Sequence, residues 1–143
     1  MAKLEMNGID GLQNAMNRIG EIPWPVTEQA LDGMAKVAAA EIKSTGESMG
    51  VRDEESDVHI LDHITTKKAK QTDDGGREQI TFDGTRRRGK KTTRNAEIAF
   101  VNEYGKKNQS ARPFIRTALA QNEDTISEPG VKIIGDWIEN NFK

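Results

Sequence analysis

Two histidines lie four residues apart and are the side chains best suited, by type and spacing, to metal chemistry. His59 and His63 would share one face of a helix, as helical metal ligands do. The segment lacks the glutamate of an HExxH motif, and the sequence has 2 histidines and no cysteine with which to complete a ligand set. We therefore expect no metal site and no cofactor.

Other residues that often carry chemistry are arranged unfavourably for it. The acidic run 53–57 lacks the central glycine and the terminal bidentate glutamate of a calcium-binding loop. Gly75-Gly76 precedes a strand-like segment and not a helix, so it is not placed to cradle a phosphate. No Ser-His-Asp order or nucleophile elbow is present. We expect a protein that is not an enzyme.

The sharpest electrostatic feature is a basic loop at about residues 85–94. Its cations are Arg86, Arg87, Arg88, Lys90, Lys91 and Arg94. Such a cluster neutralises phosphates, so it predicts contact with a nucleic-acid backbone that does not read base sequence. No aromatic side chain is interleaved for base stacking, and no helix-turn-helix pattern is present. A solvated hairpin tip and an arm that docks on an acidic protein surface remain as alternatives.

Composition indicates one domain with a thin core. The chain has 143 residues, of which 34% are hydrophobic and 31% are charged. Two stretches, 52–57 and 85–94, have the composition of disordered segments. No apolar run approaches the ~20 residues of a membrane span, and the N-terminus lacks the apolar core of a signal peptide. Without cysteines, disulfides and thiolate chemistry are excluded, and assembly in the cytosol is the simplest expectation.

Charge is segregated along the chain although the net charge is only −2. Residues 1–63 carry 5 Lys/Arg against 12 Asp/Glu, residues 64–116 carry 14 against 6, and residues 117–143 carry 2 against 5. An acidic first part, a basic middle and an acidic end predict complementary surfaces between copies of the chain, or a polyanion facing the middle. Folding can also disperse these charges harmlessly over the surface.

Hydrophobic periodicity predicts an α+β domain in the order α-α-β-β-β-α, with a kink or restart of the last helix at Pro129-Gly130. A small antiparallel sheet would be packed by a long N-terminal helix and a C-terminal helix. The predicted elements are a short edge strand at 3–6, helices at 10–19 and from Thr27 to about Ser44, a hairpin of 65–70 with 77–82, a strand at 95–101, and a helix from Pro113. Pro23-Trp24-Pro25 should separate the first two helices, with Trp24 extended and anchoring the core or an interface. An exposed acidic loop is expected at about 51–58.

One stretch has the character of a family signature. Ala99-Phe-Val-Asn-Glu-Tyr-Gly105, a short polar spacer, and Ala111-Arg-Pro-Phe-Ile-Arg116 lead into an alanine-rich helix. This pattern resembles the minor tail and neck components of long-tailed bacteriophages, the tail-component or tail-completion proteins that join head to tail. Leu61-Asp-His-Ile64 is similar to that family's Leu-x-x-Ile element, which enters its first strand. Only residues 99–119 are specific, and the charged insert 85–94 departs from the family, as does the acidic loop before Leu61.

The resemblance implies a structural virion protein of the tail or neck, assembled in the host cytoplasm. It implies a hexameric ring where portal and head-closure proteins meet the tail tube and tail terminator, with genome DNA passing through the lumen and no membrane. The basic loop would line that lumen or reach a neighbouring ring. The alternative from the residues alone is a small nucleic-acid-binding or regulatory protein that uses residues 86–94.

Within the signature, physical reasoning separates structural residues from contact residues. Packing should account for the aromatic and turn residues, Phe100, Tyr104, Gly105, Pro113 and Phe114, with Gly105 at positive φ after Tyr104. Arg112 should point at a carboxylate or a carbonyl, with Glu103 one candidate. Subunit contacts are expected from the cations Lys106, Lys107, Arg112 and Arg116.

Overall fold

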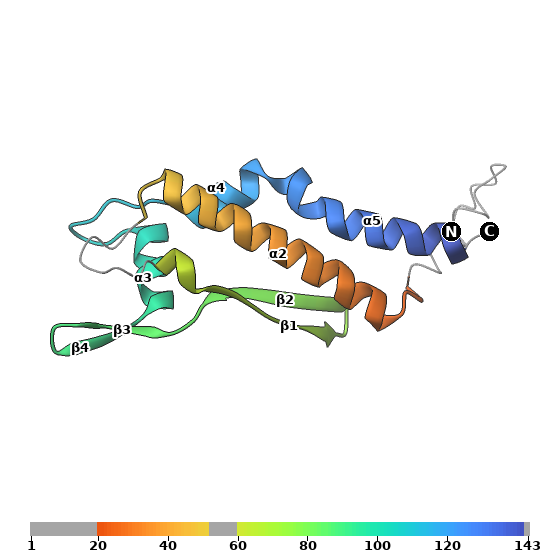
Figure 1. The fold of residues 1–143 in the computed structure, drawn as a ribbon, viewed down its shortest axis with the longest axis horizontal. Helices are drawn as coiled ribbons and strands as arrows, with labels where there is room; N and C mark the ends of the chain where they lie inside the picture. Colours follow the sequence, from red (N-terminus) through yellow and green to blue (C-terminus); the bar gives the residue numbers. More distant parts are fainter. Residues whose placement is uncertain (1–19, 52–59, 142–143) are drawn as a thin grey trace, which may run out of the picture.

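A computed structural model describes residues 20–51 and 60–141, apart from the side chain of Arg88. The elements are α2 (Trp24–Ser48), the 3-10 helix η1 (Ile60–His63), β1 (Ile64–Thr72), β2 (Gly75–Phe82), β3 (Thr85–Arg88), β4 (Lys91–Arg94), α3 (Asn95–Tyr104), α4 (Phe114–Gln121) and α5 (Glu123–Asn141). Helices with antiparallel strands make an α+β fold, as predicted (Figure 1). The strand expected at 3–6 and the helix expected at 10–19 lie outside the described residues.

Helix α2 is the centre of the fold. It lies between α5 on one side and the β1–β2 hairpin on the other (Figure 1). Small residues make this close packing possible: Ala30, Ala35 and Ala38 are buried on α2. At the crossing with α5, an added Cβ on Gly130 would fall 2.5 Å from the sulfur of Met34. The C-terminal helix thus packs mainly on α2, and α2 covers the sheet.

Both ends of α2 extend beyond their predicted bounds. The helix begins at Trp24 and not at Thr27, because Pro23 occupies the N-cap with φ −60° and ψ 141°. Pro25 then falls in the first turn, where the missing amide would have no partner anyway. The helix continues through Gly46, where an added Cβ would lie 2.6 Å from Leu61 and 3.1 Å from Phe114. Glycine at this position lets two core side chains approach the helix backbone.

The strands form two separate hairpins. β1 and β2 pair antiparallel from Ile64 opposite Phe82 to Thr72 opposite Gly75, with an irregularity between Lys67 and Lys70. β3 and β4 pair only with each other. The basic loop predicted at 85–94 is therefore a hairpin, which we call the basic hairpin. It projects at one end of the molecule's long axis (Figure 1).

The strand predicted at 95–101 is wrong, since residues Asn95–Tyr104 form helix α3. The segment satisfies the helical period as well as alternation: Asn95, Ile98, Ala99 and Glu103 are the buried positions. The signature is consequently helix α3, a turn and helix α4, and not a strand followed by a helix. Gly105 ends α3 with φ 79°, the positive value expected of it.

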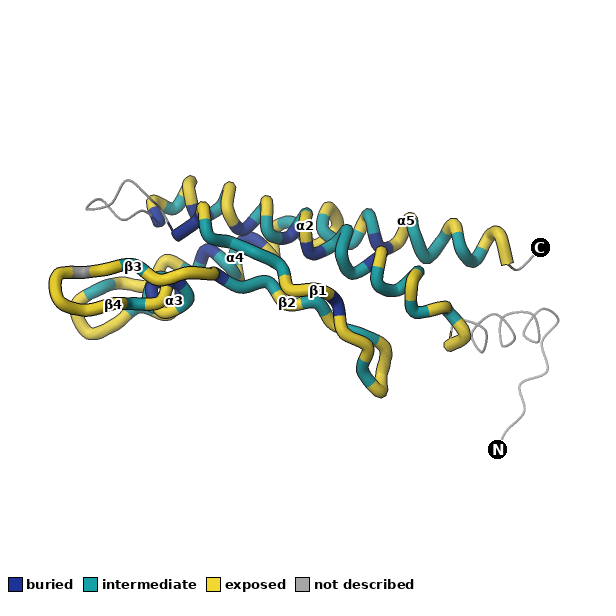
Figure 2. The backbone as a smooth tube through the Cα atoms, turned by 60° about the horizontal axis from the view of Figure 1, so that its bottom comes forward, coloured by how far each residue is buried: buried dark blue, intermediate teal, exposed yellow. Residues whose placement is uncertain are grey.

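The core collects where α2, η1, β2, α3 and α4 meet, and Figure 2 shows buried positions concentrated there and along α2. Phe114 is fully buried and meets Phe82 edge to face at 6.0 Å between ring centroids. Val51, expected in an exposed acidic loop, is fully buried; residues 52–58 of that loop lie outside the described residues. None of the described helices is long and apolar enough to cross a membrane.

The predicted interruption at Pro129-Gly130 lies inside α5. The break between α4 and α5 falls earlier, at Asn122. Ser127 donates a 2.7 Å hydrogen bond to the carbonyl oxygen of Glu123 just before the proline. Pro129 packs toward α2, where an added Cβ on Gly33 would lie 3.1 Å from its Cβ.

Candidate interaction surfaces

The basic hairpin is fixed to the body of the protein by Asn95. This side chain is buried, donates a 2.8 Å hydrogen bond to the carbonyl oxygen of Asp83, and accepts one of 3.1 Å from Nε of Arg86. The backbone N–H of Asn95 also donates a hydrogen bond to the carbonyl oxygen of Gly84. One asparagine therefore holds the entry to β3 and the start of α3 together.

The six predicted cations of the hairpin are not equivalent. Arg86 is tied to Asn95 at the base, and Arg94 pairs with Glu97 at 3.0 Å. Arg87 donates to the carbonyl oxygen of Gly89 at 3.2 Å. Lys90 and Lys91 are exposed at the tip, and Arg88 faces Lys91 in the strand register.

A hairpin of two four-residue strands without apolar side chains is marginal by itself. The exposed cations Arg87, Lys90 and Lys91 repel one another and weaken it further. A negatively charged partner would relieve this repulsion.

A second surface combines aromatic side chains with a cation. Phe100 and Tyr104 are 62% and 58% exposed, with ring centroids 4.7 Å apart, and the guanidinium of Arg116 lies 5.1 Å from the Tyr104 ring centroid. Leu119 is 41% exposed on the same helix as Arg116. We call Phe100, Tyr104, Arg116 and Leu119 the aromatic patch. The prediction that packing accounts for Phe100 and Tyr104 is wrong, because α3 turns both outward, whereas Phe114 is packed as predicted.

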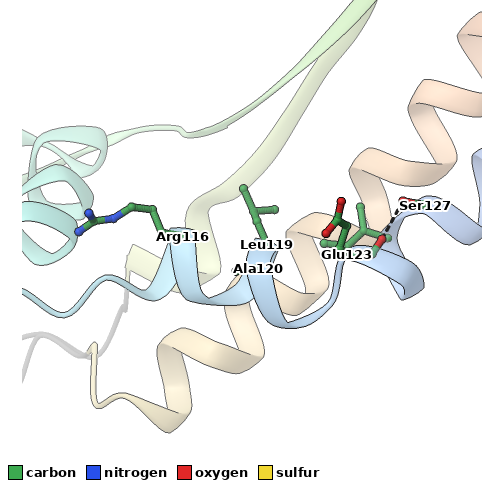
Figure 3. A pocket seen from close by; sticks show the side chains of 6 residues that line it. Arg116, Leu119, Ala120, Glu123 and Ser127 are labelled. Atoms are coloured by element: carbon green, nitrogen blue, oxygen red, sulfur yellow. Dashed lines mark hydrogen bonds between the residues drawn. The ribbon is translucent and has the colours of Figure 1, made fainter.

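A groove continues the aromatic patch along α4 and α5. It has a volume of about 510 Å³ and is lined by Arg116, Leu119, Ala120, Glu123, Ile126 and Ser127 (Figure 3). Arg116 borders both the groove and the Tyr104 ring, so patch and groove form one surface. Aromatic residues and arginine are the side chains enriched at protein–protein interfaces.

The other predicted contact residues divide into two groups. Lys106 and Lys107 are exposed in the turn after α3, which the paired backbone groups of Lys106 and Gln109 close at 3.0 Å. Arg112 does point at a carbonyl, donating to Gly50 O at 2.7 Å across 62 residues of sequence. Glu103 is not its partner, since that carboxylate binds Arg116 instead. Lys106 and Lys107 therefore remain the better candidates for contact with another molecule.

A third surface was missed by sequence reasoning. It is an open groove of about 570 Å³ between the first part of α2 and the β1–β2 hairpin, lined among others by Glu28, Asp32, Thr66, Lys68 and Glu78. We call it the acidic groove. Strand alternation was the available signal, because it places Glu78 on the same face of β2 as Ile80 and Phe82, toward α2.

Glu78 is the least satisfied carboxylate of the acidic groove. Its Oε2 is inaccessible to solvent and has no hydrogen-bond partner. Burial, and secondarily the nearby charge of Asp32, raise the pKa of Glu78, against the opposing effect of a backbone hydrogen bond at Ala69. Glu28 already meets Lys68 at 3.7 Å and Asp32 meets Lys36 at 3.0 Å, and both lysine side chains are largely exposed.

The histidines do not lead to a metal site in the described part of the chain. His63 Nδ1 lies 3.4 Å from Asp83 Oδ1, and His59 is outside the described residues. Residues 20–51 and 60–141 contain no group of three His, Cys, Asp or Glu side chains placed to hold a metal ion. Comparison of the chain with protein-family models, with curated proteins and with solved structures found no match.

Proposed function

We propose that this chain is a structural component of the virion of a long-tailed bacteriophage, forming a ring that completes the tail or joins it to the head. The observation that carries the proposal is the exposure of Phe100 and Tyr104 within the stretch that resembles tail and neck components. If these two aromatic side chains were buried in the core, packing would be enough to explain their spacing. Exposed on α3, they serve contact with another protein.

The architecture supports a subunit that is completed by neighbours. The core is small, the molecule is elongated, and the basic hairpin extends beyond the body (Figures 1 and 2). Phe100 is exposed against Tyr104, whose ring Arg116 covers, and the exposed Leu119 lines the adjoining groove with Arg116. Such surfaces are costly in a monomer and useful in an assembly.

In this proposal the working surfaces are the aromatic patch, the turn lysines Lys106 and Lys107, and the basic hairpin. The partners are further copies of the chain and the tail-tube, tail-terminator, head-closure and portal proteins. Genome DNA in the lumen would meet the hairpin cations through its backbone. The protein catalyses no reaction and needs no cofactor.

The test is the assembly state of the full chain. The mass of the purified protein is measured by light scattering and its shape by electron microscopy, alone and with tail-tube and head-closure proteins of the same phage. We expect a ring of one defined size. The double variant Phe100→Ser/Tyr104→Ser should lose the ring while its circular dichroism and thermal midpoint stay close to wild type.

Val131→Ser is the matched control, because Val131 is 69% exposed on α5 and is not part of the patch. It should assemble normally. A wild-type chain that stays monomeric both alone and with those partners would refute the proposal.

A second function is favoured by one observation: the basic hairpin is a two-stranded ribbon, and the major groove of duplex DNA admits such a ribbon. A small nucleic-acid-binding or regulatory protein would bind free duplex as a monomer or dimer, with affinity falling steeply as salt rises. Titration of a labelled duplex at about 50 and 200 mM salt distinguishes the two functions. Tight, salt-sensitive binding by a monomer would favour the second.

A further inference from the structure

The basic hairpin and the acidic groove lie toward opposite ends of the molecule. The hairpin tip at Gly89-Lys90 marks one end of the long axis, and the groove lies beside the first turns of α2, toward the other end (Figure 1). A tip and a groove so separated cannot meet within one subunit. They can meet between two.

The two surfaces are complementary in charge. Lys90 and Lys91 are exposed at the tip, and in the described part of the chain no carboxylate forms an ion pair with them. The groove brings together three carboxylates, those of Glu28, Asp32 and Glu78.

Glu78 makes the groove more than a cluster of surface acids. Its Oε2 is out of contact with solvent and unpartnered, although the side chain lines an open cavity. A buried acceptor without a donor is costly, and the cost is removed when the Glu78 carboxylate turns into the open groove to meet a donor. A lysine ammonium supplies three donors and the opposite charge.

The lysines already at the groove do not fill this role. Lys68 lies 3.7 Å from Glu28 and its side chain is 86% exposed, while Lys36 lies 3.0 Å from Asp32 with its side chain 71% exposed. Exposed pairs of this kind are weak and rearrange readily. Neither lysine forms an ion pair with Glu78, so a donor from another subunit can bind this carboxylate.

We propose that the tip of the basic hairpin of one subunit docks in the acidic groove of a neighbouring copy, with Lys90 or Lys91 pairing with Glu78. This inference rests on the proposed ring-forming function and assigns one further contact between subunits of the ring, in addition to the aromatic patch. Each subunit gives its tip to one neighbour and receives the tip of another. Such a head-to-tail contact is heterologous, and it closes into a ring when the rotation per subunit permits.

Charge reversal tests the pairing. Lys90→Glu/Lys91→Glu reverses the charge of the tip, and Glu28→Lys/Asp32→Lys reverses two carboxylates of the groove that are partly exposed. Each variant alone should fail to assemble under conditions where wild type assembles, as measured by light scattering at about 0.1 M salt. Mixed one to one, they should assemble again, because each tip then meets a groove of opposite charge. The chain carrying all four substitutions should also regain assembly.

Two further variants keep the test decisive. Lys67→Glu/Arg77→Glu reverses two exposed charges on the outer face of the β1–β2 hairpin and should assemble as wild type does. Glu78→Gln removes the charge with little change of shape and should weaken assembly at least tenfold. It also serves as the groove variant if the reversed groove does not fold.

The outcomes separate the docking contact from the proposed function. Assembly of the tip variant at wild-type strength, or failure of both the mixture and the fourfold variant to recover, would overturn the docking contact and leave ring formation standing. Loss of nucleic-acid binding by a tip variant that still assembles would assign the hairpin to nucleic acid instead. A wild-type chain that never assembles would refute the proposed function itself.

Discussion

Arg116 binds Glu103 through three hydrogen bonds that join α4 to the end of α3. Its backbone amide and its Nε donate to Glu103 Oε1 at 3.0 and 2.9 Å, and its Nη2 donates to the Glu103 carbonyl oxygen at 3.0 Å. The second carboxylate oxygen accepts the amide of Ile115 at 2.8 Å. Since Pro113 at the N-cap contributes no side-chain cap, a glutamate from another helix caps α4.

Glu103→Ala should therefore destabilise the protein substantially. The substitution removes the acceptor of two backbone amides at the start of α4 and the partner of Arg116. We expect a loss of about 1–3 kcal/mol in the free energy of unfolding, the cost of leaving such donors unsatisfied. Urea unfolding followed by circular dichroism measures it.

Arg116→Met is the informative comparison for that variant. The Arg116 side chain is 60% exposed, so its loss should cost less than 1 kcal/mol if capping dominates. Equal losses for the two variants would show that the ion pair, and not the cap, carries the stability.

Gly105→Ala should be among the most damaging single-methyl changes in the chain. Gly105 has φ 79° and ψ 177°, a region that side chains avoid, and an added Cβ would lie 2.8 Å from the backbone oxygen of Gln109. These backbone atoms cannot move aside without disturbing the turn, so we expect the free energy of unfolding to fall by about 3 kcal/mol.

Gly89→Ala provides the control, because Gly89 has φ 61° but open space around the added methyl. It should cost about 1 kcal/mol. Both variants carry the strain of positive φ, but only Gly105→Ala adds a steric clash, so thermal melts of the two measure the effect of the clash. Similar melting temperatures would contradict the steric argument.

The hydrophobic period predicted the central helix, and the turn signal at 73–76 together with the alternation of 77–82 predicted the β1–β2 hairpin. The prediction failed where the helical and strand periods coincide. In α2 the apolar stripe is long, so the helix was unambiguous and only its ends were misplaced. In residues 95–101 alternation suggested a strand, yet the same residues bury a helical face of Asn95, Ile98 and Ala99. Asn95 is buried on that face, and its hydrogen bonds with Asp83 and Arg86 are contacts that no local sequence pattern reveals.

A candidate surface was easier to predict when its residues are close together in the sequence. The basic hairpin was visible as a run of cations. Phe100 and Tyr104 of the aromatic patch were singled out in the sequence, but their exposure was not predicted. Their orientation depends on α3 being a helix. The acidic groove joins Glu28 and Glu78, which are distant in sequence, and only the packing of β2 on α2 brings them together.

Two glycines of α5 should respond in opposite directions to alanine. Gly135 has nothing within 4 Å of an added Cβ, so Gly135→Ala should stabilise the protein by roughly 0.5–1 kcal/mol through helix propensity. Gly130 faces Met34 at the α2–α5 crossing, and Gly130→Ala should cost about 1–2 kcal/mol as the methionine is displaced. Chemical denaturation of both variants measures the difference. Destabilisation by Gly135→Ala would contradict the open space found around its added Cβ.

Glu78→Gln should change stability in a pH-dependent way. Burial and the charge of Asp32 raise the pKa of Glu78 in the folded protein above its ordinary value of 4.5. The folded state thus binds this proton more tightly than the unfolded state, and the stability it contributes is fully present below the unfolded pKa. That contribution is lost as pH rises through the folded pKa.

At neutral pH the variant should therefore be more stable than wild type, because its neutral amide avoids the desolvation of a partly buried carboxylate. The advantage should shrink as pH falls and Glu78 is protonated in wild type. Urea midpoints measured from about pH 4 to pH 8 test this. Asp32→Asn, which removes a charge that Glu78 feels, should give a smaller gain of the same sign. A Glu78→Gln variant less stable than wild type at neutral pH would mean that the carboxylate is satisfied within the subunit, which would remove the reason for a neighbour's lysine to enter the acidic groove.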